Sequence, residues 1–447
     1  MTIKNKIINV ISEKIVFPGR SLCRCSDGIA LFAEGILPGE RGNVFVLKDK
    51  KTFREGILEN ITLRSKERVN PICLSFGFCG GCTFQNTSYE TQIKYKQEYV
   101  EEILGFIGIK ISKILISPQI WNYRNKMEFS FFNSGGMVEL GLHKKNSFDK
   151  YISVPPCFIA DKDFLQIVKI VKDFVNKNDL FAYNNKIHKG FFRHLVLRKA
   201  KNNNQFLVNI VTNANCKSLF LKSLVKELSE CTQSIYCTLN GQKSDVVLSE
   251  KLTLMNGKPF ITEKLCVGKR DYFFNISPFS FFQTNSKVAE IMYNKILNLL
   301  NLSKNDTLLD LYCGTGTIGI TMACNVKKVV GVDQYAIENA KENSLMNNAL
   351  NVEFYTSSVE NWLKKTVVDF DVIIVDPPRS GLTRGVINFL MLSKAKKILY
   401  ISCNPSTLVR DLQIIVKSGK YKTTEIIPID MFPQTYHIEV MVLLEAL

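Results

Sequence analysis

In the last third of the chain, three runs of apolar residues each end at a turn that carries a polar or reactive side chain. The runs and their turns occupy residues 307–314, 370–379 and 398–405. Near-continuous apolar strands that stop at turn residues are typical of a parallel sheet with helices on both faces. Ligands bind at the carboxyl ends of the strands in such sheets. We therefore expect Gly314, Asp376 and Cys403, which stand in these turns, to converge on one crevice.

The rest of the chain follows other patterns. The first 60 or so residues are rich in Val, Ile and Phe with regularly spaced turn residues, which predicts a small all-β barrel. A cysteine–glycine loop then leads into mixed helical and strand-like segments, which indicate an α+β region. Strands alternate with helices towards the C-terminus. We expect an all-β barrel, an α+β central domain and a doubly wound, Rossmann-like α/β domain at residues 1–60, 61–270 and 271–447, with the helical segment near 89–118 packed on the last.

A glycine-rich turn predicts a nucleoside site in the last domain. Gly314-Thr315-Gly316-Thr317-Ile318-Gly319 follows the first apolar run and opens a helix, so a ligand can approach its backbone closely. Another apolar run ends on Asp333, 19 residues after Gly314, where an acidic residue accepts hydrogen bonds from ribose hydroxyls. The turn lacks a third properly spaced glycine and a Walker lysine. A nucleoside without phosphates, such as S-adenosylmethionine, therefore fits best, and a plain strand–helix turn is the alternative.

Three side chains in the last domain are candidates for chemistry. Cys403 stands between a strand and a helix, and the positive end of the helix dipole predicts a lowered pKa and more thiolate. The alternative is that Cys403 is a small buried apolar residue. Asp376, which precedes two prolines, is either a ligand contact or a helix N-cap. Glu439, at the start of the last apolar strand, is either a general base or a solvated strand-start residue.

The cysteine–glycine loop is the strongest metal signal in the chain. Cys73, Cys79 and Cys82 lie within ten residues, and the intervening glycines let backbone amides turn toward sulfur. A fourth ligand has to come from elsewhere in the chain, and Cys157 is the best candidate. Zinc and an iron–sulfur cluster both accept four cysteines, so the spacing leaves the choice between them open.

Composition favours a nucleic-acid partner in a reducing compartment. The net charge is +17 and the pI is near 9.2, which predicts a polyanionic partner. No apolar run approaches the roughly 20 residues that span a bilayer, so nucleic acid is favoured over a membrane. The N-terminal residues do not form a signal-peptide pattern, and thirteen scattered cysteines do not resemble a secreted disulfide scaffold. We expect a cytoplasmic protein, and the sequence indicates no obligate protein partner.

With these motifs the chain resembles the RNA uracil-5-methyltransferases, in particular the RlmD type, which modifies 23S ribosomal RNA. The resemblance covers nearly the whole chain. The first 60 residues look like the TRAM domain of the family, an OB-like RNA-binding barrel. The matching segments of the last domain lie at residues 282–285, 310–314, 376–381, 402–405 and 437–439.

The resemblance implies roles for ten side chains. Four cysteines would bind a [4Fe–4S] cluster, four residues would contact S-adenosylmethionine, and two would be catalytic. They are Cys73, Cys79, Cys82 and Cys157 for the cluster, Gln283, Tyr312, Asp333 and Asp376 for the cofactor, and Cys403 as nucleophile with Glu439 as general base. Asp333 departs from the family, which commonly has glutamate there; the shorter side chain can still accept two ribose hydrogen bonds.

The resemblance also implies a reaction, methylation of carbon 5 of a uridine in RNA. Cys403 would add to carbon 6, because carbon 5 of uracil is too weak a nucleophile by itself. Glu439 would remove the proton from carbon 5 before the thiol is released. The implied substrate is 23S ribosomal RNA, with transfer RNA as the alternative.

Two other functional classes can be weighed from the residues. A non-catalytic RNA-binding protein would have no use for an intact set of Cys403, Glu439 and Asp376. An amino-group methyltransferase usually carries an aromatic residue after Asp-Pro-Pro, where it stacks on the target base. Arg379 occupies that position in this chain, which disfavours amino-group methylation.

Overall fold

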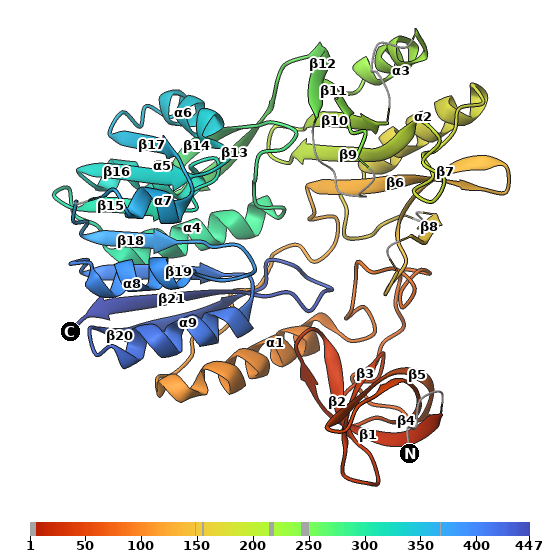
Figure 1. The fold of residues 1–447 in the computed structure, drawn as a ribbon, viewed down its shortest axis with the longest axis horizontal. Helices are drawn as coiled ribbons and strands as arrows, with labels where there is room; N and C mark the ends of the chain where they lie inside the picture. The colour runs from red at the N-terminus through yellow and green to blue at the C-terminus, as the bar shows by residue number, and fades with distance from the viewer. Residues whose placement is uncertain (1–5, 148, 154–155, 214–218, 243–249, 367) are drawn as a thin grey trace.

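Five strands near the N-terminus close into a barrel in the computed structural model, which describes residues 6–147, 149–153, 156–213, 219–242, 250–366 and 368–447 (Figure 1). In the order in which they pair, the strands are β1 (Ile7–Val16), β2 (Arg20–Arg24), β3 (Ala30–Glu34), β5 (Phe53–Leu63) and β4 (Arg41–Asp49). Alternate side chains of each strand, such as Leu31, Ala33, Val44 and Val46, fill the interior. The predicted barrel is confirmed, and it ends at Leu63 rather than at residue 60.

A seven-stranded sheet forms the central part of the molecule. Its order is β12 (Lys251–Gly257), β11 (Ser234–Leu239), β10 (Gln205–Thr212), β9 (Phe192–Ala200), β6 (Lys126–Ser134), β7 (Met137–His143) and β8 (Tyr151–Ser153). The helices α2 (Phe164–Lys177) and α3 (Leu219–Ser229) accompany it, and their apolar residues share one core with the sheet. An α+β arrangement, as the sequence predicts, is therefore present.

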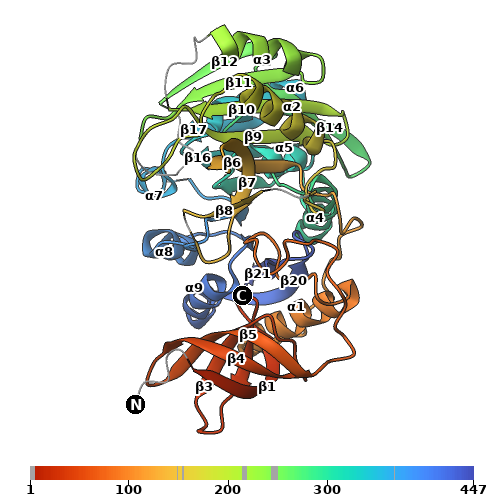
Figure 2. The same cartoon turned by 90° about the vertical axis from the view of Figure 1, so that its right-hand side faces the viewer.

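The C-terminal part is a second seven-stranded sheet with helices on both faces (Figures 1 and 2). Its order is β17 (Val352–Thr356), β16 (Lys328–Asp333), β15 (Thr307–Leu311), β18 (Val372–Val375), β19 (Lys397–Ser402), β21 (Glu439–Ala446) and β20 (Tyr421–Ile429). The helices are α4 (Ser286–Leu300), α5 (Thr317–Met322), α6 (Ile337–Met346), α7 (Val359–Leu363), α8 (Arg384–Leu392) and α9 (Pro405–Lys417). Two separate apolar cores, one on each face, bury the inner strands β15, β18 and β19 almost completely, whereas the edge strand β17 is partly exposed. This is the expected doubly wound Rossmann-like domain.

The register of this sheet brings the ends of four strands together. The strands β15, β18 and β19 run parallel, with Leu311 beside Val375 and Val375 beside Tyr400. Because they run parallel, the turns that follow them leave the sheet at one edge. The strand β21 runs antiparallel to β19, so its first residue lies at the same edge.

Two segments outside residues 271–447 also belong to the C-terminal core. The helix α1 (Tyr89–Leu104) lies between the barrel and the C-terminal sheet, and its Val100 and Leu104 are in one of the two cores (Figure 2). The hairpin of β13 (Ile261–Val267) and β14 (Arg270–Ile276) is in the other core. A boundary between residues 270 and 271 would divide this hairpin, so we propose to place it before β13. No helix in the described ranges is long and apolar enough to cross a membrane.

Candidate active site

Cys403 and Glu439 come from neighbouring antiparallel strands. Ser402, the last residue of β19, lies opposite Val440 of β21. One residue further out, the chain continues to Cys403 on one strand and Glu439 on the other. The predicted nucleophile and base therefore lie at the same edge of the sheet, although 35 residues separate them in the sequence.

The surroundings of Cys403 do not activate the thiol in the way that the sequence predicts. Burial, together with the smaller effect of the nearby carboxyl groups of Glu439 and Asp376, raises the pKa of Cys403 to about 11. The expected lowering by the helix dipole is therefore wrong. The helix α9 begins at Pro405 with Asn404 as its N-cap, so Cys403 lies outside it. Arg379 is the nearby cation that opposes this rise in pKa.

Glu439 is a buried carboxyl group. Only 5% of the residue is exposed, so the alternative of a solvated strand-start residue is wrong. Burial raises the pKa of Glu439 well above its ordinary value, Asp376 adds to this, and Arg379 opposes it. A carboxyl group with a raised pKa and little water around it is typical of a general acid or base.

Asp376 and Arg379 bring opposite charges to this edge. Burial raises the pKa of Asp376 to about 7. Asp376 is not a helix N-cap, since Thr383 precedes the next helix, α8, in that position. The turn that carries Arg379 is tied to the cysteine turn, because Asn404 donates a side-chain hydrogen bond of 2.9 Å to the carbonyl oxygen of Arg379. Arg379 was not among the site residues predicted from the sequence.

The glycine-rich turn after β15 has the backbone shape that a ligand site needs. Gly314 and Gly316 have φ angles of 55° and 77°, in the region that favours glycine. A Cβ on Gly316 would lie 2.6 Å from the ring of Phe354, so the turn could not hold a larger residue there. Gly316 is also the N-cap of α5. This geometry explains both glycines and fits a ligand site and a plain strand–helix turn equally, so the cofactor site stays a prediction.

The four predicted cofactor contacts have different local partners, and Asp333 is the one bonded to this turn. Asp333 accepts hydrogen bonds from the amides of Gly314 (3.1 Å) and Tyr335 (2.8 Å). The Tyr312 hydroxyl donates to Glu360 at 3.4 Å. Gln283 is buried, and the carbonyl oxygens of residues 283 and 284 both accept hydrogen bonds from Asn125. Together with Asp376, described above, these residues come from four separate chain segments.

Asp310 is a further carboxyl group at the site that the sequence analysis did not single out. It is 1% exposed and its Oδ2 accepts a hydrogen bond of 3.0 Å from the Gly319 amide. Within the described residues its Oδ1 has no hydrogen-bond partner. Burial raises its pKa to about 7, with a smaller contribution from Asp376 and Asp333. A charged residue within an apolar strand was the signal that could have identified it.

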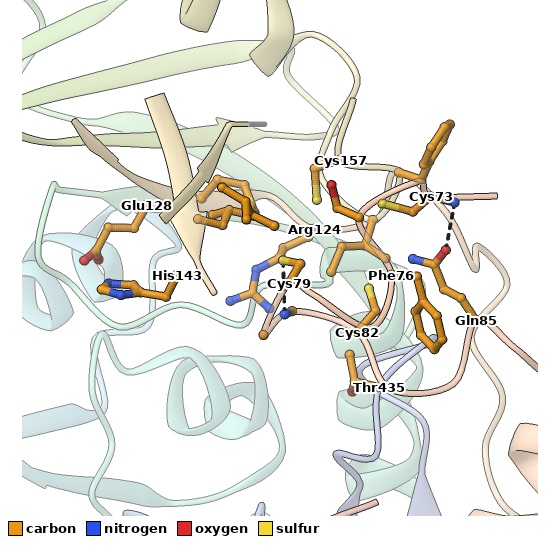
Figure 3. A pocket seen from close by; sticks show the side chains of 18 of the residues that line it. Cys73, Phe76, Cys79, Cys82, Gln85, Arg124, Glu128, His143, Cys157 and Thr435 are labelled. Atoms are coloured by element: carbon orange, nitrogen blue, oxygen red, sulfur yellow. Dashed lines mark hydrogen bonds between the residues drawn. The ribbon is translucent and has the colours of Figure 1, made fainter. Parts of the chain in front are cut away.

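The four cysteines of the predicted metal site line one cavity of about 380 Å³ (Figure 3). Cys73, Cys79 and Cys82 line it from the cysteine–glycine loop, and Cys157 lines it from a separate segment of the chain. The Gly81 amide donates a hydrogen bond of 3.4 Å to Cys79 Sγ, as expected for glycines that turn amides toward sulfur. Burial raises the pKa of Cys82 to about 12, and the other three thiols contribute to the rise, so the four face one another.

The placement of these thiols does not confirm the predicted metal site. Among the described residues, no group of three or more His, Cys, Asp or Glu side chains is placed to hold one metal ion. The cavity is also lined by Arg124 and by Thr435 and His437, which belong to the loop before β21. The cysteine cavity therefore lies next to the segment that leads to Glu439.

Comparison with known proteins identifies the family. Residues 88–447 match the family model of the tRNA (uracil-5-)-methyltransferases. The chain belongs to this family. It is 38% identical over 452 residues to an uncharacterized RNA methyltransferase of Caldanaerobacter subterraneus subsp. tengcongensis, covering 99% of each chain. It is 36% identical to one of Clostridium acetobutylicum, covering 99% of this chain and 98% of the relative.

A solved structure of the tRNA (uracil-5-)-methyltransferase family has the same fold. It is the Pyrococcus abyssi tRNA (uracil-54, C5)-methyltransferase, in complex with S-adenosyl-L-homocysteine. The two structures superpose with a TM-score of 0.78 at 29% identity, over 97% of this chain and 99% of the other. The predicted family and enzyme class, an S-adenosylmethionine-dependent RNA methyltransferase, are thereby confirmed.

Proposed function

We propose that this enzyme methylates carbon 5 of a uridine in RNA through a covalent adduct with Cys403. The observation that carries the proposal is the placement of Cys403, Glu439 and Asp376 at one edge of the sheet. The family supplies the reaction type, and the relative from Pyrococcus abyssi is named for the same position of uracil. The charge of +17 supports a polyanionic substrate.

The residues around the glycine-rich turn fit S-adenosylmethionine, which supplies an electrophilic methyl group on a sulfonium. Asp333 would accept hydrogen bonds from the ribose hydroxyls, because each carboxylate oxygen can accept more than the one bond that it makes now. Gln283, Tyr312 and Asp376 complete the proposed contacts. The carboxyl of Asp376, near Cys403, adds negative charge beside a cationic donor.

In the first step, the sulfur of Cys403 adds to carbon 6 of the uracil and makes carbon 5 nucleophilic as part of an enolate. The thiol proton passes to solvent water, and Arg379 favours its loss because its charge opposes the rise in the pKa of Cys403. Carbon 5 then bonds to the methyl carbon, and the carbon–sulfonium bond breaks with its electron pair left on sulfur. The sulfur of Cys403 is therefore the nucleophile that starts the reaction.

In the second step, Glu439 takes the proton from carbon 5. The electrons of that carbon–hydrogen bond re-form the ring double bond, and the bond from carbon 6 to Cys403 breaks, which returns a thiolate. A raised pKa makes the Glu439 carboxylate a stronger base than an exposed glutamate. The target base has to be unpaired or flipped out of its stack, because carbons 5 and 6 are otherwise covered.

Substitution of the nucleophile tests this proposal. The Cys403→Ala variant should retain cofactor binding, lose methyl transfer, and form no covalent complex with RNA that contains 5-fluorouridine. The fluorine cannot leave as a proton does, so the wild-type enzyme should remain attached to this RNA. Cys324→Ala is the control, since Cys324 is an exposed thiol in the same domain, outside the glycine-rich turn. Methyl transfer by the Cys403→Ala variant would refute the mechanism.

Two kinds of RNA are candidate substrates. The resemblance favours 23S ribosomal RNA, whereas the family and the Pyrococcus abyssi relative are named for tRNA. Both substrates would place the enzyme in the cytoplasm. Mass spectrometry of ribosomal and transfer RNA from a deletion strain would identify the RNA that loses 5-methyluridine.

We further propose that the four cysteines hold a [4Fe–4S] cluster. In a cubane each thiolate binds a different iron, so the sulfurs stand farther apart than four ligands of a single zinc ion. Four thiols that line one cavity of about 380 Å³ support a shared metal group, and the resemblance to the family favours the cluster over zinc. Its role would be to hold the cysteine–glycine loop in place, because the cavity lies outside the cofactor turn.

A further inference from the structure

The loop between β20 and β21 determines where Glu439 lies. Ile429, the last residue of β20, pairs with Glu439, the first residue of β21. The intervening residues, 430–438, therefore close a loop directly at the carboxyl group that serves as base. A displacement of this loop would shift the Glu439 backbone, because no residue separates the loop from Glu439.

The helix α1 holds the middle of this loop through a pair of buried amides. The Gln92 side chain donates a hydrogen bond of 3.0 Å to Gln434 Oε1, and its own oxygen accepts one of 3.0 Å from the Gln434 backbone amide. Gln92 also donates to the carbonyl oxygens of Phe84 (3.0 Å) and Thr87 (3.2 Å). Gln92 is 1% and Gln434 2% exposed. Gln434 has a φ of 68°, so these bonds hold a strained backbone.

The same helix holds the start of the loop. Lys96 forms a buried ion pair of 2.5 Å with Asp430 and donates 3.1 Å to the carbonyl oxygen of Phe432. The hydroxyl of Tyr89 donates to the other oxygen of Asp430 at 2.8 Å. A buried charge pair with additional hydrogen bonds has little freedom to rearrange, because any movement leaves a charge without a partner.

The cysteine–glycine loop is hydrogen-bonded to Gln434 as well. The backbone amides of Thr83 and Phe84, next to Cys82, donate to the Gln434 carbonyl oxygen at 2.9 and 3.1 Å. Gln92 thus connects three segments, since its side chain bonds to Phe84, Thr87 and Gln434. The cysteine–glycine loop, α1 and the loop before Glu439 therefore form one hydrogen-bonded unit.

We infer that Gln92 is a positioning residue for the general base Glu439, and that the cysteine–glycine loop acts on catalysis through the Gln92–Gln434 pair. This inference rests on the function proposed above. It assigns Gln92 to the proton-removal step, because the pair supports the segment that ends at Glu439 and does not contact the strand that carries Cys403. Loss of the pair should therefore slow the release of methylated RNA more than the formation of the adduct.

The experiment compares Gln92→Leu with Lys94→Met, a control on the same helix whose side chain is 68% exposed. Three quantities are measured for each: cofactor affinity, the rate of adduct formation with 5-fluorouridine RNA, and the rate at which ordinary RNA is released from its covalent complex. Base catalysis contributes typically about 10²–10⁴-fold. A misplaced Glu439 should therefore slow release roughly tenfold or more, with the first two quantities unchanged.

A second variant keeps the test valid if Gln92→Leu does not fold. Gln92→Glu exchanges one nitrogen for oxygen, so the new carboxylate oxygen would face the carbonyl oxygens of Phe84 and Thr87. At lower pH the new carboxyl group is protonated and can donate again. Its release rate relative to wild type should therefore recover as the pH falls, which a general loss of stability would not produce.

The outcomes separate this inference from the proposed function. No adduct between the wild-type enzyme and 5-fluorouridine RNA would refute the proposed mechanism itself. An adduct with the wild type, together with release at the wild-type rate in both Gln92 variants, would overturn the positioning role alone. An equal fall in adduct formation and release would also overturn it. Combining Gln92→Leu with Glu439→Gln should slow release no further than Glu439→Gln does, because both changes affect one step.

Discussion

Cys403 and Glu439 lie at the same edge of the C-terminal sheet because each is one residue beyond the last paired position, Ser402 opposite Val440, of the antiparallel strands β19 and β21. The carboxyl group of Glu439 is close enough to contribute to the raised pKa of the Cys403 thiol. A nucleophile and a base are thus brought together by strand pairing, and the base affects the charge state of the nucleophile.

Replacement of the base should trap the enzyme on its RNA. In Glu439→Gln the amide cannot accept the proton from carbon 5, so addition of Cys403 should proceed while elimination slows by roughly 10²–10⁴-fold. A denaturation-resistant complex with ordinary uridine RNA, seen on a denaturing gel, is the expected result. Glu445→Gln, at the far end of the same strand, is the control. Normal turnover without such a complex would show that Glu439 is not the base.

The hydrogen bond from Asn404 to Arg379 joins the turn that carries Cys403 to the turn that carries Asp376, and its loss should reduce activity as well as stability. Asn404→Ala removes the N-cap of α9 and the hydrogen bond to the Arg379 carbonyl oxygen. Loss of an N-cap costs about 1 kcal/mol of unfolding free energy. Ser418→Ala, which removes a side-chain hydrogen bond at the other end of α9, is the control. Urea unfolding and methyl transfer are measured for both, and only Asn404→Ala should lose activity; equal activities would argue against a role of this hydrogen bond in activity.

The reactivity of Cys403 should follow the charges around it. Arg379 lowers the pKa of this thiol, so Arg379→Gln should raise the pKa, reduce the thiolate fraction at a given pH and slow alkylation by iodoacetamide. Asp376 raises the pKa, so Asp376→Asn should speed alkylation. Mass spectrometry of the Cys403 peptide measures both rates. Arg384→Gln, an exposed residue of α8, is the control, and unchanged rates in all variants would contradict the charge assignment.

The barrel should influence the catalytic loop through Gly19. A Cβ at Gly19 would lie 2.7 Å from Tyr436 Cβ, three residues before Glu439. Gly28 has a similar φ, 80° against 77°, and open space around it. Gly19→Ala and Gly28→Ala should therefore each lose roughly 1–2 kcal/mol of unfolding free energy through backbone strain, which thermal unfolding measures. Only Gly19→Ala should also reduce methyl transfer. Equal activity in the two variants would mean that the barrel and Tyr436 are not coupled.

The cysteine cavity should contain iron. Protein purified without oxygen should hold about four irons per chain, as a cubane with four cysteine ligands requires. Cys157→Ser should lower the iron content, whereas Cys231→Ser, a half-buried cysteine of the same part of the chain, should leave it unchanged. Metal analysis that finds stoichiometric zinc and no iron would refute the cluster. Full iron in Cys157→Ser would remove Cys157 from its ligands.

Local patterns in the sequence were sufficient for the elements and for most of the chemistry. The three apolar runs became β15, β18 and β19, and alternation in the first 60 residues became the barrel. Both predictions rely on periodicity, which adjacent residues determine. The same is true of the glycine-rich turn, because a φ above zero is a property of one residue and its neighbours.

Properties that depend on distant segments could not be read from the sequence. The helix dipole predicted a lowered pKa for Cys403, but burial and the carboxyl groups of Glu439 and Asp376 raise it. Sequence could not decide whether Glu439 is solvated, because the segments that cover it come from elsewhere in the chain. Contacts between distant segments also determine the position of α1 on the C-terminal core and the Gln92–Gln434 pair, whose residues are 342 positions apart. Desolvation and long-range hydrogen bonds depend on which segments meet, and that is a property of the folded chain alone.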